Sequence, residues 1–142
     1  KTPLEIARAW IDAAARCDLP AIRDGMAENC LRYGEPDWMV MGKADYIAGY
    51  TQYLTSFSDY RLEIVNTVTS GMTTVFEMIE SATFSAPYPL PDGRVIQPSG
   101  DTYTDRVCTW VEVDEDGLIS EIRAYIPSTR GQLMANAMAA MG

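Results

Sequence analysis

The order in which the hydrophobic pattern changes along the chain constrains the fold most. Up to about residue 56, apolar residues recur at the three- and four-residue spacing of amphipathic helices. From Tyr60 to Ile126 the pattern changes to segments that alternate every second residue and are rich in β-branched and aromatic side chains. Helices grouped before strands favour an α+β fold over one in which helices and strands alternate.

Three helices are expected in the first part of the chain. The segment 2–5 combines a capping threonine, a proline suited to the first helical position and a glutamate that can complete a capping box. Asp18 can cap a second helix because its carboxylate can accept hydrogen bonds from backbone N–H groups of the first turn. The expected elements are helices at about 2–16, 18–26 and 43–56, with a short strand at 30–33 between the last two.

The second part of the chain predicts an antiparallel sheet. Asp-Gly at 116–117 suits the positive φ angles of a tight hairpin turn, and Ser-Gly at 70–71 indicates another turn. The segment 87–100 holds four of the eight prolines, so we expect an excursion at a sheet edge with a short arm at 94–96. Strands are expected at about 60–70, 73–86, 101–114 and 118–126, followed by a helix that Ser128 can cap.

The length of 142 residues fits one domain, so we expect a single domain spanning 1–142. Within it, a curved antiparallel sheet should wrap around the N-terminal helices. This arrangement forms a cone with a closed base and an open mouth. The predicted fold class is therefore α+β with a conical interior.

Charge and composition exclude several classes of function. The net charge of −9 argues against nucleic acid and anionic membrane surfaces as partners, because both need a basic surface. The chain has no histidine, so a Ser-His-Asp triad, a Cys-His pair and the common zinc sites that use imidazole are impossible. An acid–base step near neutral pH would fall to a carboxylate or to a tyrosine.

The cysteines predict a reducing compartment. Cys17, Cys30 and Cys108 are odd in number and widely spaced, which is not typical of a disulfide framework or a zinc cluster. Reduced thiols in a cytoplasmic protein are the expected state. No apolar run reaches membrane length, and the first residues do not have the pattern of a signal peptide.

The segment Leu31–Asp37 holds the first candidate site. Side chains alternate in an extended segment, so Tyr33 and Glu35 should point into the protein if Leu31 does. An inward Glu35 could act as a general base with a pKa raised by an apolar pocket, or it could be a solvated acid at a strand end. Tyr33 could donate a hydrogen bond to a ligand, or it could be buried and bonded to backbone.

Glu80 is the second candidate acid. It alternates with Phe76, Met78, Ala82 and Phe84, and an acid among such neighbours indicates a group that faces a cavity. The alternative is a salt bridge across the sheet to Arg106 or Arg123.

Four segments of the chain resemble a known family. They are Cys17-Asp18-Leu19-Pro20-Ala21-Ile22, Glu35-Pro36, Gly42-Lys43-Ala44-Asp45-Tyr46-Ile47 and the closing run from Asp116 to Tyr125. Together these resemble the SnoaL-like and ketosteroid isomerase-like proteins of the nuclear transport factor two-like superfamily, over nearly the whole chain. The resemblance implies a cystatin-like α+β barrel. It implies less about function, because this fold hosts isomerases, cyclases, dehydratases, epoxide hydrolases and plain binders.

The resemblance also suggests roles for single residues. Glu35 falls where ketosteroid isomerases carry their proton-shuttling aspartate, Trp10 where they place an oxyanion-binding tyrosine, and Thr109 where they hold a protonated aspartate. An indole donates only through its one N–H, so the isomerase oxyanion hole is not reproduced. Many SnoaL-like cyclases use an acid on the penultimate strands, and Asp101 and Asp105 are the nearest candidates here.

Two other mechanisms of the fold fit less well. Limonene epoxide hydrolase-like members use an Asp-Arg-Asp set, and here the closing aspartate position falls on Pro127 and the paired positions on Met78 and Glu80. Scytalone dehydratase-like members depend on histidine, which this chain lacks.

The expected function is a small-molecule enzyme of the isomerase, lyase or cyclase type. A carboxylate would remove a proton next to a carbonyl, while Tyr33 or Trp10 would steady the developing enolate oxygen. No metal or organic cofactor is needed, and the substrate should be apolar and fairly flat. The candidate catalytic residues are Glu35, Tyr33 and Asp105, and the candidate ligand-binding residues are Trp10, Tyr50, Phe76, Met78, Glu80, Val111 and Arg123.

Two alternatives from other classes remain at this point. One is a non-catalytic domain of the same fold that binds a hydrophobic metabolite. The other is a structural dimerisation module, which would have a filled cone. A homodimer through the outer sheet face is expected in any case, because Trp110 and Cys108 lie opposite the inward valines of their strand and the family commonly pairs subunits there. The substrate and the reaction are not specified by the sequence.

Overall fold

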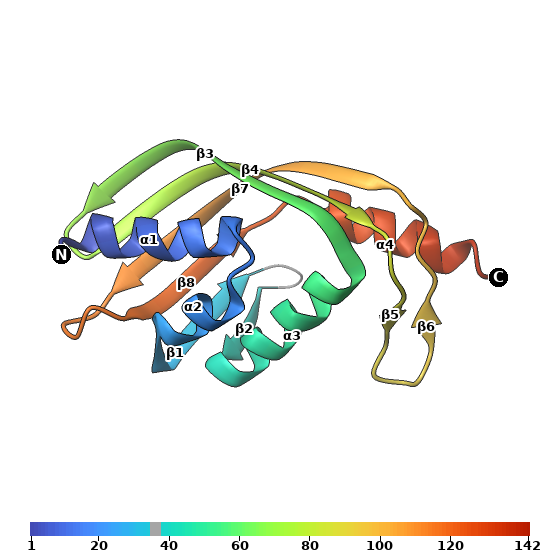
Figure 1. Cartoon of the computed structure of the whole chain (residues 1–142), viewed down its shortest axis with the longest axis horizontal. Coiled ribbons are helices and arrows are strands. Elements are labelled where there is room, and N and C mark those ends of the chain that lie inside the picture. The colour runs from blue at the N-terminus through green and yellow to red at the C-terminus, as the bar shows by residue number, and fades with distance from the viewer. Residues whose placement is uncertain (35–37) are drawn as a thin grey trace.

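The structure is a computed structural model that describes residues 1–34 and 38–142. Four helices and eight strands follow one another along these residues (Figure 1). The elements are α1 (Pro3–Ala15), α2 (Leu19–Asp24), β1 (Met26–Gly34), β2 (Met39–Gly42), α3 (Lys43–Ser56), β3 (Phe57–Ser70), β4 (Thr73–Phe84), β5 (Tyr88–Pro89), β6 (Val95–Ile96), β7 (Thr102–Val113), β8 (Ile119–Tyr125) and α4 (Thr129–Ala139).

Six of the strands form one curved sheet in the order β2-β1-β8-β7-β4-β3. Neighbouring strands are antiparallel except β1 and β8, which are parallel. Figure 1 shows β3, β4 and β7 arching over α1, with α3 closing the space from below and α4 lying beside the short β5–β6 arm. The expected α+β cone is confirmed, and its sheet stays open because β2 and β3 form its two edges.

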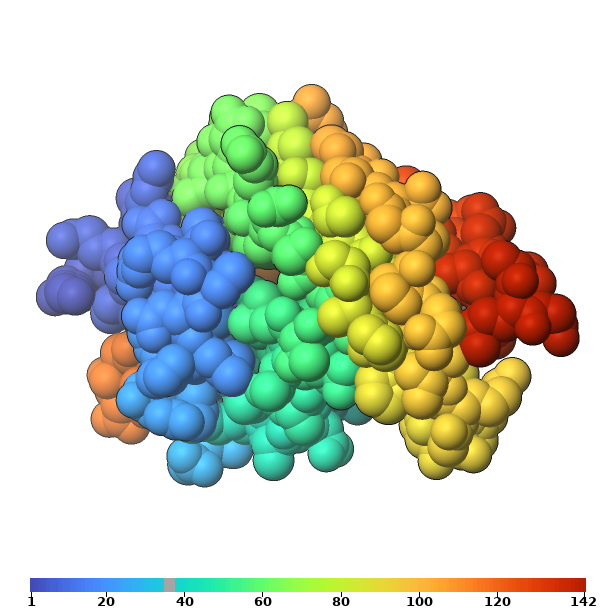
Figure 2. All heavy atoms as spheres, turned by 45° about the vertical axis from the view of Figure 1, so that its right-hand side comes forward, coloured from blue at the N-terminus to red at the C-terminus, as the bar shows by residue number. Residues whose placement is uncertain are grey.

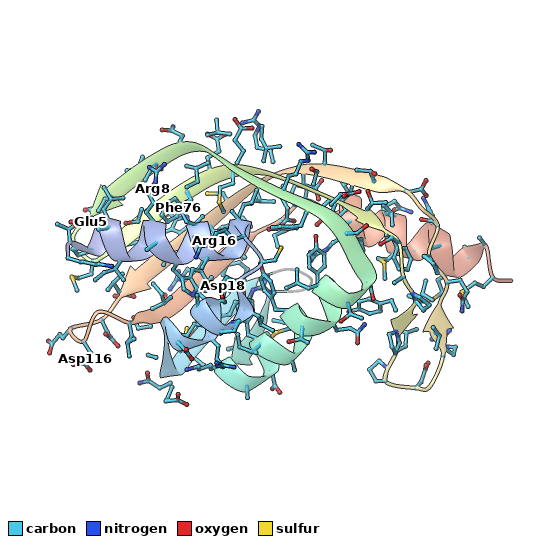
Figure 3. The ribbon with its side chains drawn as sticks, viewed as in Figure 1. Glu5, Arg8, Arg16, Asp18, Phe76 and Asp116 are labelled. Carbon is cyan, nitrogen blue, oxygen red and sulfur yellow. The ribbon has the colours of Figure 1, made fainter. Side chains whose placement is uncertain are left out.

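The first two helices begin as the sequence predicts. The Thr2 hydroxyl accepts from the Glu5 backbone N–H at 3.1 Å, and the Glu5 carboxylate accepts from the Thr2 N–H at 3.2 Å. This capping box satisfies N–H groups that the first turn leaves without helical partners. Asp18 caps α2 by accepting from the Ala21 N–H at 3.2 Å, and Figure 3 places Glu5 and Asp18 at these two helix starts.

The N-terminal half differs from the prediction in two respects. β1 is longer than the expected 30–33, and β2 was not expected. The reason is tertiary pairing, because β1 lies between β8 and β2 and draws ladder hydrogen bonds from both. The expected capping of the last helix is also incomplete, since Ser128 stands at the N-cap of α4 without a side-chain hydrogen bond.

The core lies between α1 and the concave face of the sheet. Ala7 and Ile11 of α1 pack with Phe76, Val111 and other fully buried residues at the base of the cone. Phe76 lies beneath the arch of the strands, next to α1 (Figure 3). A second buried cluster lies towards the mouth, where Phe57, Phe84 and Tyr103 meet Leu133 of α4. Apolar packing therefore fills the base of the cone. Helices α3 and α4 border the interior that remains.

Candidate functional site

A cavity of about 1060 Å³ lies inside the cone, between the concave face of the sheet and helices α1, α3 and α4. Its wall is mainly apolar or aromatic and includes Trp10, Tyr50 and Met78. The charged residues that reach it are Arg32, Glu80, Arg94 and Arg130. Figure 2 shows a narrow hollow on one face, between α1–α2 (blue) and α3–β3 (green). A mainly apolar cavity with a few polar groups is the usual form of a small-molecule site.

Glu80 presents its carboxylate to this cavity from the middle of β4. The Tyr60 hydroxyl of β3 donates to its Oε2 at 2.7 Å, and the Tyr103 hydroxyl of β7 donates to its Oε1 at 3.0 Å. A carboxylate has about four lone-pair sites, so two phenols orient the group and leave sites on both oxygens for a ligand. Glu80 therefore faces inward, as its alternation with apolar residues predicts.

The salt bridge considered as an alternative for Glu80 is not formed. Arg106 pairs with Glu77 at 3.2 Å, and Arg123 pairs with Glu121 at 2.9 Å. Both pairs lie on the outer face of the sheet, because Arg106 and Arg123 occupy outward positions of β7 and β8. The interpretation of Glu80 as half of a cross-sheet ion pair is therefore wrong.

Tyrosines from three elements, α3, β3 and β7, surround Glu80. We call Tyr46, Tyr50, Tyr53, Tyr60 and Tyr103 the tyrosine cluster. The Tyr53 and Tyr103 hydroxyls are hydrogen-bonded to each other. The rings of Tyr46, Tyr50, Tyr53 and Tyr60 make a chain of edge-to-face contacts with centroids 5.9 to 6.4 Å apart. This geometry is favourable for aromatic rings and holds the hydroxyl groups in fixed positions.

The phenols of the cluster stay protonated well above neutral pH. Burial raises the pKa of Tyr60 and Tyr103, and the nearby charge of Glu80 raises both further. Burial likewise raises the pKa of Tyr50 and of Tyr53, and it raises that of Tyr46 to about 12. These hydroxyls can therefore donate hydrogen bonds, or give up a proton to a strong base, but they do not add negative charge to the cavity.

Asp105 is a second inward carboxylate and lies directly opposite Glu80 in the β4–β7 register. It is 3% exposed, and its Oδ2 has no hydrogen-bond partner among the residues that the structure describes. Directly opposed side chains of antiparallel strands have Cβ atoms about 4.5 to 5.5 Å apart. Asp105 lies beside Glu80 on the same face of the sheet, but it is not among the residues that line the cavity.

The comparisons with known proteins agree with this architecture. The family model described as a SnoaL-like domain matches residues 7–122. The chain belongs to the SnoaL-like domain family. No curated protein sequence matches it.

Solved structures support the fold of this SnoaL-like domain. They include the pinacolase BvnE from Penicillium brevicompactum (TM-score 0.76, 12% identity, 98% of this chain and 95% of that chain covered). An NTF2-like protein from Burkholderia thailandensis gives 0.74 at 18% identity, covering 94% and 98%. An LEH-like epoxide hydrolase from M. tuberculosis gives a TM-score of 0.69 at 13% identity, covering 98% of this chain and 93% of that chain. Identities this low carry the fold alone, and the neighbours' activities differ from one another.

Trp10 forms a wall of the SnoaL-like cavity and has no donor left for a ligand. Its Nε1–H donates to the backbone oxygen of Ile22 at 3.0 Å. Gly25 permits this close packing, because a Cβ at that position would lie 2.9 Å from Trp10 Cδ1. Trp10 therefore has no N–H left to donate to an enolate oxygen, and it does not fit the role suggested for it.

The expectation that Leu31 and Tyr33 of β1 point into the protein is wrong. Leu31 is 40% exposed, whereas Arg32 is 8% exposed and reaches the cavity. Tyr33 lies outside the cavity wall, with its ring stacked on Trp38 at 6.3 Å. Gly34 is the sequence feature that could have indicated this orientation. A Cβ at position 34 would lie only 2.8 Å from Arg32 Cζ, so the Arg32 side chain in its inward position leaves room there only for a glycine.

The other candidate residues divide between the cavity and its surroundings. Tyr50, Met78 and Glu80 line the cavity, as expected. Phe76 and Val111 are fully buried in the core at the base and do not line it. Arg123 lies on the outer face, with its guanidinium carbon 5.7 Å from the centroid of the Tyr33 ring. Glu35 falls outside the described residues, as do positions 36 and 37.

Sequence reasoning missed Tyr60, Tyr103 and Arg130 as site residues. Tyr103 could have been found by extending the inward alternation of Asp105 and Val107 by one step towards the strand start. Tyr60 sits two positions before Leu62, the register partner of Glu80, so its approach depends on the β3–β4 pairing. No sequence pattern places Arg130 against these strands.

Two further findings concern the described residues as a whole. No helix among them is long and apolar enough to cross a membrane. In residues 1–34 and 38–142, no three Cys, Asp or Glu side chains are grouped so that they could hold a metal ion.

Proposed function

We propose that this SnoaL-like domain is a small-molecule enzyme in which a cavity carboxylate removes a proton next to a carbonyl group of an apolar substrate. The observation that carries the proposal is the position of Glu80 in a mainly apolar wall, oriented by two phenols and without a contacting cation among the described residues. Water-poor surroundings strengthen the interaction of such a group with a developing charge. Glu80 is the base in this proposal.

The remaining groups of the cavity fit the other half of the reaction. Tyr50 lines the cavity, and its hydroxyl has no hydrogen-bond partner in the described part of the chain. Its raised pKa keeps it protonated, so it can donate to the oxygen of an enolate. Glu80 takes the α-proton, the C–H electron pair becomes the enolate double bond, and the negative charge moves to the oxygen.

The fate of the enolate defines the class of reaction. Return of the proton from Glu80 to another carbon gives an isomerisation, expulsion of a β-substituent gives a lyase reaction, and attack on a second carbonyl gives a cyclisation. These steps share the same proton abstraction and need no further reactant. The proposal therefore covers all three and does not name the substrate.

Exchange of a carbon-bound proton for deuterium tests the shared step directly. The probe is 2-tetralone, an apolar fused-ring ketone, incubated in D₂O and followed by proton NMR. We expect the wild-type protein to accelerate exchange and Glu80→Gln to slow it by about 10²- to 10⁴-fold, the usual contribution of a general base. Glu77→Gln is the matched control, because Glu77 lies on the same strand but faces outward in an ion pair with Arg106.

Glu35 is the competing base. If Glu35→Gln abolishes exchange and Glu80→Gln leaves it intact, the role assigned to Glu80 is wrong and the position implied by the ketosteroid isomerase resemblance holds the base. If tetralone stabilises the protein against heat but no variant, including wild type, accelerates exchange, the chain is a ligand-binding domain of the same fold. Thermal melting of each variant shows whether a loss of exchange reflects unfolding.

A further inference from the structure

Arg130 brings a positive charge into the cavity from the first turn of α4. Its guanidinium carbon lies 4.9 Å from the centroid of the Tyr53 ring and 6.0 Å from that of Tyr103. The helix that carries it packs against β7 and β6, beside the mouth of the cone (Figure 1). Arg130 is therefore held over the same phenols that connect to Glu80.

The charge of Arg130 is not neutralised by direct contact. Within the described residues, no carboxylate lies within 4.0 Å of its guanidinium. Burial by itself would lower the pKa of Arg130, but Tyr103, Glu80 and Tyr53 outweigh it, so the pKa is raised and the group stays charged. The two oxygens of Glu80 accept from Tyr60 and Tyr103 instead.

Seven of the other eight arginines lie on the surface instead. Five of them pair with an acid on the surface: Arg16, Arg23, Arg94, Arg106 and Arg123. Arg61, which has no ion pair in the described residues, is exposed to solvent on β3. A charge in water needs no partner, whereas a charge enclosed by apolar and aromatic groups is costly until an opposite charge meets it.

We propose that Arg130 binds a carboxylate of the ligand, so that the substrate is an apolar, ring-bearing keto acid. This inference rests on the proposed function, since the same cavity binds the substrate whose proton Glu80 removes. A guanidinium that stacks on an aromatic ring keeps N–H donors at its edge, and these match the two oxygens of a carboxylate. The phenol of Tyr103 bonds Glu80 while its ring lies beneath Arg130, so the anchored carboxylate and the reacting carbonyl occupy neighbouring parts of one molecule.

The apolar body of the ligand has suitable contacts around this anchor. Met134 and Met138 of α4 line the cavity on the same helix as Arg130. Leu90 and Ile96 line it from the short β5–β6 arm and the residues next to it. Methionine side chains are flexible and adapt to rings of different shape. The expected ligand therefore combines one anion with an otherwise hydrophobic frame.

A matched pair of ligands tests the inference without any turnover. The probes are 2-naphthoate and methyl 2-naphthoate, which share the ring system and differ in charge. We expect the wild-type protein to bind the acid about 10- to 100-fold more tightly than the ester at neutral pH, the range of a hydrogen bond to a charged group. Arg130→Met should remove this preference, Arg130→Lys should keep part of it, and Arg61→Met should leave it unchanged. Dissociation constants come from isothermal titration calorimetry.

The outcomes separate this inference from the proposed function. Glu80→Gln should bind the acid at least as tightly as the wild type, because it removes a nearby negative charge, even though it stops proton exchange. Equal binding of acid and ester by the wild type, an unchanged preference in Arg130→Met, or no binding of the acid would each overturn the role of Arg130. Arg130→Gln replaces Arg130→Met if the latter fails to melt cooperatively.

Discussion

Glu77 and Glu80 lie three positions apart on β4 and face opposite sides of the sheet. Glu77 is on the outer face, where it pairs with Arg106 at 3.2 Å and where the side chains of Arg106 and Glu77 are 59% and 40% exposed. Glu80 is on the inner face, where it accepts hydrogen bonds from Tyr60 and Tyr103. The same side chain on the same strand therefore meets a cation in water on one face and neutral donors in a cavity on the other.

This difference separates a surface acid from a candidate catalytic one. On the outer face, water and salt screen the charges, and the pair needs no special environment. On the inner face, phenols fix the direction of the carboxylate without cancelling its charge. The position of an acid relative to the sheet, more than its residue type, decides whether it can act on a ligand.

The largest effect expected to distinguish the inner face from the outer face is a loss of folding stability at alkaline pH. The five phenols of the tyrosine cluster have raised pKa values in the folded protein, so their contribution to stability is fully present below the unfolded value near pH 10. Above that pH the unfolded state loses protons that the folded state retains. Each phenol then reduces the free energy of unfolding by about 1.4 kcal/mol per pH unit, so the protein should unfold cooperatively just above pH 10.

Circular dichroism and tyrosinate absorbance, recorded together, check this prediction. Both signals should change at the same pH, because the cluster ionises only when the cone opens. Tyr60→Phe and Tyr103→Phe should make the loss of stability with pH shallower, since each removes one linked proton. Full ionisation of all eight tyrosines in a protein that keeps its native dichroism would show that the cluster is accessible to solvent.

A core substitution should have the next largest effect. Phe76 is fully buried on the inner face of β4, whereas Val68 on β3 is 61% exposed. Phe76→Ala should lower the free energy of unfolding by about 3 to 5 kcal/mol, because it removes apolar contacts and leaves a cavity at the base of the cone. Val68→Ala should change it by no more than about 0.5 kcal/mol. Urea unfolding measures both, and similar values for the two variants would contradict a packed base.

The sequence predicts the fold better than it predicts the site. The helix starts at Thr2 and Asp18 depend on local capping chemistry, and the structure confirms both. The inward direction of Glu80 follows from alternation with apolar residues on both sides. In each case the deciding information lies within a few residues of the chain.

The predictions that failed, and the site residues that were missed, depend on contacts between segments far apart in the sequence. Leu31 and Cys30 are both apolar, so alternation alone does not decide which of them points inward, and the parallel pairing of β1 with β8 settles it. The donors of Glu80 come from 20 and 23 residues away, across two strand registers. Arg130 reaches the cavity only because α4 docks beside β7, for which the sequence holds no local signal.

The smallest expected effect concerns the ion pair on the outer face. A double-mutant cycle with Glu77→Gln and Arg106→Gln should give a coupling of about 0.2 to 1 kcal/mol that falls as salt is added, as for other exposed pairs. The cycle also bears on the predicted homodimer, whose expected surface includes the exposed Trp110 on the same face. A coupling well above 1 kcal/mol that grows with protein concentration would mean that a second copy covers this face, because removal from water strengthens the attraction between the two charges. A weak coupling at every concentration would leave Glu77 as the solvated counterpart of Glu80.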